Sequence, residues 1–203
     1  MNPTIVIDRE YGSGGREVAK ILSEKLKIRF FDGDLLAEAS TRYGIDLGVM
    51  KEYDEKKTGS MLYNIVMIAN SFNNPDEIDM PFKIYDALSR IMKQLVLEDS
   101  CIFLGRCADE VLKDTVPLIR VFIYSDNKEE KIKRISDIDG MPRYIAEDAL
   151  RKKDAQRRNY YHYFTEREWG DKKNYDLCIN TAKIGYEGAA NIIADVYESM
   201  KMK

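Results

Sequence analysis

Five short apolar segments alternate along the chain with longer segments whose apolar residues recur at helical spacing. Uninterrupted apolar runs are typical of strands that are buried on both faces of a parallel sheet. Apolar residues three and four positions apart predict amphipathic helices, most clearly over 18–26 and 84–95. This alternation predicts an α/β fold. The expected strands are residues 4–7, 28–31, 101–104, 118–124 and 175–181.

A glycine-rich loop separates the first expected strand from the first helix. Gly12, Gly14 and Gly15 lie within four residues, and the helix is expected to begin near Arg16. Glycines in such a loop adopt positive φ angles and turn backbone N–H groups toward an anion, which a helix N-terminus also attracts. A tight turn that binds nothing is the alternative. Strand, glycine loop and helix in immediate succession favour a phosphate site.

The loop matches a Walker A sequence, G-x-x-x-x-G-K-S/T, only in part. Alignment of Gly12-Ser13-Gly14 with the usual G-x-G places Gly15 at the lysine position and Arg16 at the hydroxyl position. A shift by one residue places Arg16 at the lysine position and Glu17 at the hydroxyl position. Neither alignment restores the complete motif.

Polar residues follow the second and third strands, whose carboxyl ends should converge with the glycine loop on one crevice. Asp32 and Asp34 could hold Mg²⁺ or accept a proton from an acceptor hydroxyl, with an ordinary turn and helix cap as the alternative. Arg106 follows Gly105 and could bind a phosphate or carboxylate through two parallel N–H bonds. A surface arginine that pairs with Asp109 is the alternative.

Residues 35–81 lack strand character and form an insertion after the second strand. They contain two expected helical pieces, 35–42 and 61–71, and are long enough for a small acceptor-binding lobe. A strong helix is expected from Pro81. Farther along the chain, Asp126 followed three residues later by a glutamate predicts the N-cap of another helix.

The densest basic cluster lies on a helix that is expected from 142 to about 160. Arginines on more than one face of a helix cannot all be buried, so some must meet solvent, carboxylates or a phosphate ligand. A solvated helix is the alternative to a lid whose arginines close over a transferred phosphoryl group. The aromatic residues at 159–164 indicate packing rather than base stacking. The basic residues are Arg143, Arg151, Lys152, Lys153, Arg157 and Arg158.

Composition limits the partners and the location of the protein. The 203 residues are 44% apolar, which is enough for one core and a single domain. A net charge of −3 gives no general attraction to nucleic acid or to an anionic membrane, so neither is an expected partner. The early first strand and the absence of a long apolar run predict a cytoplasmic protein. Cys101, Cys107 and Cys178 are expected to be reduced core thiols.

Five segments carry these features in combination: IDREYGSGGRE (7–17), FFD (30–32), FLGRCAD (103–109), RRNYYHYFTEREWG (157–170) and NYDLCINT (174–181). Together they resemble the cytidylate kinase-like family of P-loop nucleoside monophosphate kinases, over nearly the whole chain. The resemblance implies a P-loop NTPase fold, a three-layer α/β/α arrangement with a five-stranded parallel sheet. It also implies a helical acceptor lobe at 35–81 and a basic lid at about 140–170.

The same resemblance implies ATP with Mg²⁺ as the phosphoryl donor and a small nucleotide such as CMP, or another phosphorylated compound, as the acceptor. Asp32 and Arg106 would face the acceptor. Arg151, Arg157 and Arg158 would act from the lid. The donor phosphates would be wrapped by Gly12, Ser13, Gly14, Gly15 and Arg16.

Two departures from the family pattern leave the function open. Cytidylate kinases have a lysine and a hydroxyl residue in the loop, whereas here Arg16 could supply the charge and Glu17 could bind Mg²⁺ or repel ATP. The segment FFDGD at 30–34 also lacks the pattern expected for CMP, so another acceptor is possible. A kinase is the first hypothesis, a nucleotide- or phosphate-sensing module without transfer chemistry is the second, and a structural scaffold is the weakest.

Overall fold

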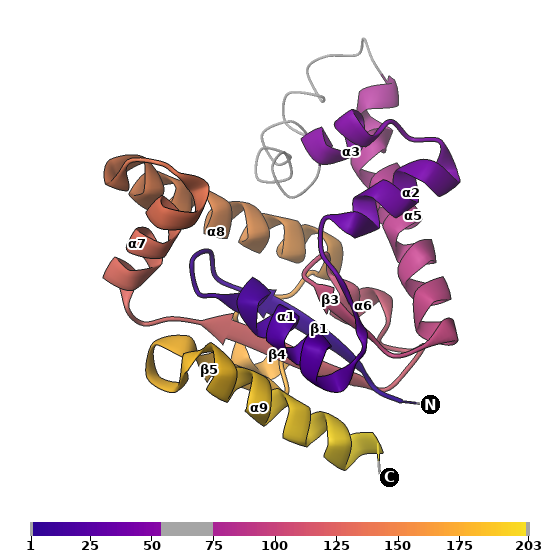
Figure 1. Cartoon of the computed structure of the whole chain (residues 1–203). Coiled ribbons are helices and arrows are strands. Elements are labelled where there is room, and N and C mark those ends of the chain that lie inside the picture. The colour runs from indigo at the N-terminus through magenta and orange to yellow at the C-terminus, as the bar shows by residue number, and fades with distance from the viewer. Residues whose placement is uncertain (1, 54–74, 202–203) are drawn as a thin grey trace.

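The computed structural model describes residues 2–53 and 75–201, and its centre is a five-stranded parallel sheet (Figure 1). The strand order is β2-β3-β1-β4-β5, and each neighbouring pair is parallel. This sheet confirms the predicted α/β fold, and two of the predicted strands have the observed bounds. The strands are β1 (Thr4–Arg9), β2 (Arg29–Phe31), β3 (Cys101–Leu104), β4 (Leu118–Tyr124) and β5 (Leu177–Asn180).

Helices lie on both faces of the sheet and beyond its carboxyl edge. They are α1 (Gly15–Leu26), α2 (Asp34–Tyr43), α3 (Leu47–Tyr53), α5 (Pro75–Glu98), α6 (Ala108–Val111), α7 (Lys128–Asp139), α8 (Arg143–Thr165), the 3₁₀ turn η2 (Lys172–Asn174) and α9 (Thr181–Lys201). Helices α1 and α9 pack together on one face. Helices α5 and α6 cover the other, and α2 and α3 pack against α5. In Figure 1 the α7–α8 pair stands on the opposite side of the view from α2, α3 and α5.

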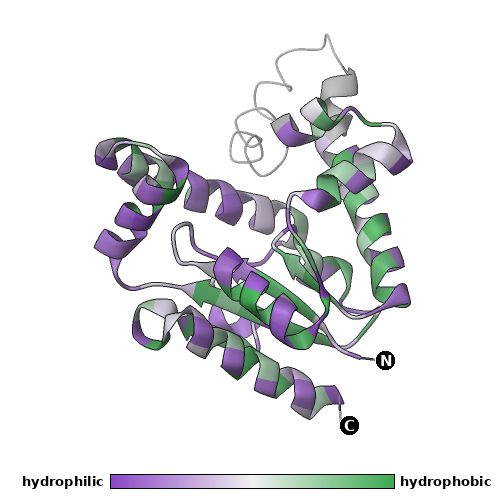
Figure 2. Cartoon of the chain, in the orientation of Figure 1, coloured by the Kyte–Doolittle hydropathy of each residue, from purple (hydrophilic) through white to green (hydrophobic). Residues whose placement is uncertain are grey.

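The central strand connects two hydrophobic cores because successive residues of a strand point to opposite faces. Ile5 and Ile7 belong to the core beneath α1 and α9. Val6 belongs to the core beneath α5. All three side chains are buried, and the strands stand out as hydrophobic segments in Figure 2, where α7 and α8 are mostly hydrophilic. The three-layer α/β/α arrangement follows from this alternation.

Two predicted helix starts are wrong. Helix α5 begins at Pro75 and contains Pro81, which was the expected start. The helix continues through Pro81 because the apolar face from Ile84 onward is buried, and such packing can exceed the roughly 3 kcal/mol that an interior proline costs. The N-cap of α7 is Asn127, one residue after the predicted Asp126, and its side chain accepts a hydrogen bond from the backbone N–H of residue 130 at 3.2 Å.

Other expectations have mixed outcomes. Cys101 and Cys107 are buried free thiols as predicted, but Cys178 is exposed, because it lies on the edge strand β5. The expected helical piece at 61–71 lies outside the described residues. Among the helices that are described, none has an apolar stretch sufficient to cross a bilayer.

The aromatic residues near the end of α8 pack on the sheet. Tyr160 and Tyr161 are buried in a cluster with Phe122 of β4, Trp169 and Tyr175. The ring centroids of Phe122 and Trp169 are 5.1 Å apart, and those of Phe122 and Tyr175 are 5.0 Å apart. The cluster confirms the interpretation of the segment as packing and fixes one end of α8 on the sheet.

A threonine hydroxyl ties the end of β5 to the glycine loop. Thr181 Oγ1 lies 2.7 Å from the carbonyl oxygen of Ser13 and 3.1 Å from that of Tyr124. The side chain of Ser13 is also turned inward, 2.8 Å from the carbonyl oxygen of Glu10 and 3.2 Å from that of Ile123. These bonds hold the loop against the ends of two strands.

We expect Thr181→Val to lower the free energy of unfolding by about 1–3 kcal/mol, because the buried Ser13 carbonyl would lose its donor. Thr181→Ser retains the hydroxyl and should lose less than half of that amount. Urea unfolding measures both variants, provided that the slope of the transition is unchanged. A valine variant as stable as the original protein would show that the hydroxyl does not anchor the loop.

Candidate functional site

A cavity of about 280 Å³ lies where the β1–α1 loop meets α7 and α8, at the carboxyl edge of the sheet. Ligands of open α/β sheets bind at this edge. The lining comes from the loop and the start of α1, the ends of β2 and β3, and the facing sides of α7 and α8. The lining residues are Arg9, Glu10, Tyr11, Gly12, Gly14, Gly15, Arg16, Glu17, Asp32, Leu104, Arg134, Ile135, Ile138, Asp139, Lys153 and Arg157.

The loop backbone has the shape that its glycines predicted. Gly12 and Gly14 have φ angles of 77° and 82°. A Cβ atom at Gly14 would lie 2.2 Å from the ring of Tyr186 in α9, and one at Gly12 would lie 2.9 Å from the carbonyl oxygen of Lys131 in α7. Side chains at either position would therefore push the loop away from the helices that support it.

The N-terminus of α1 opens onto the cavity. Gly14 is its N-cap residue, and no side chain there caps the helix. The first N–H groups of a helix lack partners within the helix, and together with the helix dipole they favour an anion. Gly15 and Arg16, the first two residues of α1, line the cavity. This arrangement can bind phosphate oxygens.

Glu10 and Lys131 hold the start of the loop, where it leaves β1. Glu10 Oε2 accepts a hydrogen bond from Lys131 Nζ at 2.7 Å and another from the backbone N–H of Ser125 at 3.2 Å. Both Glu10 and Lys131 have small exposed fractions, 27% and 11%, so the pair is well shielded from water. Lys131 therefore supports the loop and is not the missing Walker lysine.

Arg106 is buried at the end of β3. The residues Gly105, Arg106 and Cys107 have successive φ angles of 74°, 64° and 54°, and the left-handed region is rare for residues other than glycine. Backbone strain of this kind persists where the surroundings enforce it, which is frequent at functional sites. The alternative of a surface arginine paired with Asp109 is wrong, because Arg106 is 7% exposed and Asp109 pairs with Arg167.

Arg106 lies near Arg157, with which it lines a second, smaller cavity. Burial is the largest cause that lowers the pKa of Arg106 to about 10; the charges of Arg9 and Arg157 act in the same direction, whereas those of Tyr160 and Asp32 oppose the decrease. These arginines come from β1, the end of β3 and α8. A bound anion would reduce their mutual repulsion.

Of the three predicted lid arginines, only Arg157 lines the cavity. Its Nη1 donates a hydrogen bond to the carbonyl oxygen of Arg9 at 2.9 Å. Arg151 forms an ion pair with Asp148 and is 71% exposed. The guanidinium of Arg158 lies 5.9 Å from the centre of the Trp169 ring. The structure thus brings Arg157, but neither Arg151 nor Arg158, to the loop.

Two of the carboxylates that line the cavity are paired with arginines. Asp32 Oδ2 lies 2.9 Å from Arg16 Nε, and Glu17 forms an ion pair with Arg134 of α7. Asp34 is exposed at the start of α2 and does not line the cavity. Within residues 2–53 and 75–201, no group of three or more potential metal ligands is present.

Tyr11, at the tip of the loop, joins the loop to both α7 and α8. Its hydroxyl donates a hydrogen bond to Asp139, and its backbone N–H donates one to Asp154 Oδ1 at 2.7 Å. Lys153 Nζ lies 4.2 Å from the centre of its ring. Burial raises the pKa of Tyr11. Tyr11, Lys153 and Arg9 line the cavity but are not among the site residues that the sequence predicts, although the bulky residues 9–11 before the first glycine are a visible signal.

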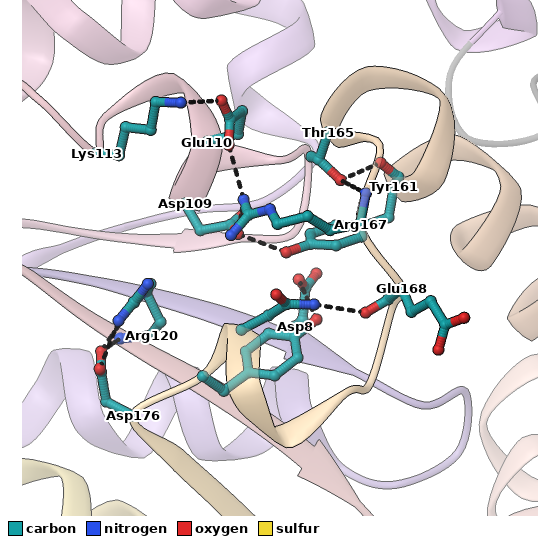
Figure 3. A network of polar contacts seen from close by, with 12 residues as sticks. Asp8, Asp109, Glu110, Lys113, Arg120, Tyr161, Thr165, Arg167, Glu168 and Asp176 are labelled. Atoms are coloured by element: carbon teal, nitrogen blue, oxygen red, sulfur yellow. Dashed lines mark hydrogen bonds and ion pairs between the residues drawn. The ribbon is translucent and has the colours of Figure 1, made fainter.

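A buried polar network fixes the base of α8 (Figure 3). Asp109 Oδ2 accepts hydrogen bonds from the Tyr161 hydroxyl at 2.7 Å and from Arg167 Nη2 at 2.9 Å, and Arg167 also pairs with Glu110 at 2.9 Å. Burial raises the pKa of Asp109. Because Asp109 follows Arg106 in the chain by three residues, the network also supports the strained segment that holds Arg106.

A profile of the "Cytidylate kinase-like family" matches residues 4–183. The chain belongs to this family. The cytidylate kinase of Archaeoglobus fulgidus is 25% identical over 200 residues, which cover 98% of this chain and 97% of that protein. The cytidylate kinase of Methanocaldococcus jannaschii is 22% identical over 192 residues, 94% of each chain. The family resemblance expected from the sequence is therefore confirmed.

Solved structures place this member of the family among the P-loop kinases in fold. An uncharacterized protein from Eubacterium ventriosum has a TM-score of 0.71 at 27% identity, covering 97% of this chain and 99% of that one. Shikimate kinase from Acinetobacter baumannii has a TM-score of 0.52 at 17% identity, covering 100% and 97%. The expected P-loop fold is confirmed.

We expect Arg106→Gly to separate stability from binding. The free energy of unfolding should fall by no more than about 3 kcal/mol, because relief of the left-handed strain offsets part of the packing and polar contacts that are lost. With CMP as a phosphate-bearing probe, affinity should fall by at least about tenfold if Arg106 contacts the phosphate group. Urea unfolding and calorimetric titration measure the two quantities.

Lys27→Gly is the matched control for backbone strain. Lys27 also has a positive φ angle, 55°, but it is exposed at the end of α1 and does not line the cavity. This variant should gain about 1 kcal/mol of stability and bind CMP unchanged. If Arg106→Gly instead lost more than about 3 kcal/mol, Arg106 would be a structural residue.

Proposed function

We propose that this protein transfers the γ-phosphoryl group of ATP to a nucleoside monophosphate, with CMP as the first candidate acceptor. One observation carries the proposal: an uncapped helix N-terminus and the arginines Arg9 of β1 and Arg157 of α8 line one cavity at the carboxyl edge of the sheet. Arg106, at the end of β3, lines a smaller cavity that shares Arg157. Membership of the family supports the same chemistry.

The donor phosphates would lie on the glycine loop. The backbone N–H groups of Gly14, Gly15 and Arg16 would donate to phosphate oxygens, and Gly12 allows the turn that brings them together. Ser13 would shape the loop through its inward hydrogen bonds. When bound, Mg²⁺ would neutralise phosphate charge, and Glu17 and Asp32 are the carboxylates on the cavity wall that could hold its water ligands.

The acceptor would lie on the side of β2 and β3. Asp32 follows β2 and lines the cavity, and Arg106 lies within the reach of its charge. Arg106 would bind the acceptor phosphate through two N–H groups. A monophosphate is ionised near neutral pH, so Asp32 need not remove a proton from it and would orient Arg16 instead. We propose that residues 35–81 form the acceptor lobe.

The lid would be the region at about 140–170, which contains α8. Phosphoryl transfer develops charge on the oxygens of the moving group, and positioned cations stabilise that charge. Arg157 and Lys153 are the α8 cations that line the cavity. They would contact the transferred group, while the outward-facing Arg151 would not.

A nucleotide-binding module without transfer chemistry is the second candidate. The loop has glycine and arginine where a Walker A loop has lysine and a hydroxyl residue. Asp32 and Glu17, which line the cavity, are already paired with arginines. These features favour binding over catalysis, so turnover has to be measured directly.

Release of ADP from ATP and Mg²⁺ tests the proposal with CMP, UMP, AMP, GMP and small alcohols as acceptors. We expect turnover that depends on a nucleoside monophosphate and is highest for CMP. Arg157→Ala should lower kcat by at least about a hundredfold, because an arginine on the transferred group supplies about 10³–10⁵ in related enzymes. Binding of ATP without turnover for any acceptor would establish the binding module instead.

Arg151→Ala tests whether position on the helix matters. Arg151 belongs to the same basic helix as Arg157, but it is exposed and paired with Asp148. We expect its loss to change kcat by less than about twofold, since surface ion pairs contribute little. Equal losses in the two variants would mean that α8 acts through its total charge and not through one aligned arginine.

A further inference from the structure

The side chain of Arg9 occupies the space in front of Gly15. A Cβ atom at Gly15 would lie 2.5 Å from Arg9 Cβ and 2.9 Å from Arg9 Cγ. Both distances are shorter than real Cβ contacts allow, and the nearer atom is attached directly to the backbone of β1, so it cannot move aside. Gly15 is therefore the only residue that fits beside Arg9 without displacement of the strand or the helix.

Gly15 is also the position at which a Walker A alignment expects the lysine. The position that lacks the lysine, Gly15, therefore lies directly beside the side chain of Arg9, at the N-terminus of α1. We propose that Arg9 supplies the donor phosphates with the positive charge that a loop lysine usually supplies, and that Gly15 is small because Arg9 passes in front of it. This inference rests on the binding of ATP that the proposed function requires, and not on the transfer step itself.

The position of Arg9 suits this role. It is the last residue of the central strand and pairs in register with Ile123 of β4. Its carbonyl oxygen accepts the hydrogen bond from Arg157. The side chain is 9% exposed and lines the same cavity as Gly14 and Gly15. A guanidinium held in this way can bind two phosphate oxygens in parallel with little loss of conformational freedom.

The other nearby cations are placed differently. Arg16 is 60% exposed and pairs with Asp32 at the rim. Lys131 is bound to Glu10 beneath the loop. Among the loop and α7 cations, Arg9 is thus the one that combines burial, strand anchoring and a position on the cavity wall at Gly15.

Calorimetric titration with ATP, ADP and AMP in the absence of acceptor tests the charge. Arg9→Met retains an unbranched stem beside Gly15 and removes the guanidinium. We expect it to weaken ATP and ADP binding by at least about tenfold and AMP binding by less than about threefold, because AMP lacks the outer phosphates. The ATP and ADP affinities of Arg9→Lys, which keeps a positive charge, should lie between those of the original protein and those of Arg9→Met. Unchanged ATP affinity in Arg9→Met would overturn the proposal.

Arg90→Ala is the charge-matched control. Arg90 is exposed on α5, pairs with Asp86 and does not line the cavity. Its loss should leave all three affinities within about twofold, because exposed pairs contribute little. Arg16→Ala should weaken ATP binding less than Arg9→Met does. A larger loss for Arg16→Ala would assign the loop charge to Arg16 and contradict the proposal.

Exchange of the residues at positions 9 and 15 tests whether Gly15 is small because Arg9 lies in front of it. Gly15→Lys alone should lower the melting temperature and weaken ATP binding by at least about tenfold, because its Cβ would meet Arg9 Cβ. The double variant Arg9→Gly with Gly15→Lys moves the cation to the usual Walker position and should recover binding to within about threefold of the original protein. A double variant no better than Gly15→Lys would refute the exchange of roles.

The outcomes separate this inference from the proposed function. If the protein binds ATP through Arg9 but transfers no phosphoryl group to any acceptor, the inference holds and the kinase function fails. If turnover occurs and Arg9→Met binds ATP and ADP as the original protein does, the kinase function holds and the inference fails. Melting temperature and far-UV circular dichroism establish that each variant is folded before its affinity is compared.

Discussion

The close contacts of three glycines with their neighbours determine the shape of the site. Cβ atoms at Gly12, Gly14 and Gly15 would collide with α7, α9 and β1 respectively. The loop can therefore pack this closely against β1, α7 and α9 only because these three positions lack side chains. Because the loop is fixed in this way, the N-terminus of α1 faces the cavity, and the cations that line it take their positions relative to one defined anion site.

Concentration of positive charge is the second property of the site. Arg9, Arg106 and Arg157 are far apart in the sequence, yet the charges of the first and third lower the pKa of the second. A bound polyanion would reduce their mutual repulsion. A ligand that binds only the folded state stabilises it. The strained backbone at Arg106 fits the same explanation, since binding of a phosphate ligand would offset part of the free energy that the strained, buried arginine costs.

The middle and the carboxyl end of helix α8 have different surroundings. Near its carboxyl end, Tyr161 and the following Arg167 bind Asp109, and aromatic residues pack on the sheet (Figure 3). Closer to its middle, Asp154 and Lys153 contact Tyr11 at the tip of the loop. Helix α8 thus connects the sheet and α6 to the tip of the glycine loop. An anchored helix that presents Arg157 to the cavity is suited to stabilise charge without large rearrangement.

The sequence by itself determined the parallel sheet, the glycine loop and the position of Arg106 at a strand end, because apolar runs and glycine spacing are local signals. It also contained the family motifs. The tertiary structure alone decided which cations meet. Arg151, Arg157 and Arg158 lie on one helix, and successive helical residues differ by about 100° in direction, so the packing of α8 against α7 and the sheet selects Arg157. Arg9 resembles any strand residue until its contact with Gly15 is seen, because the two meet only when the chain reverses at the loop.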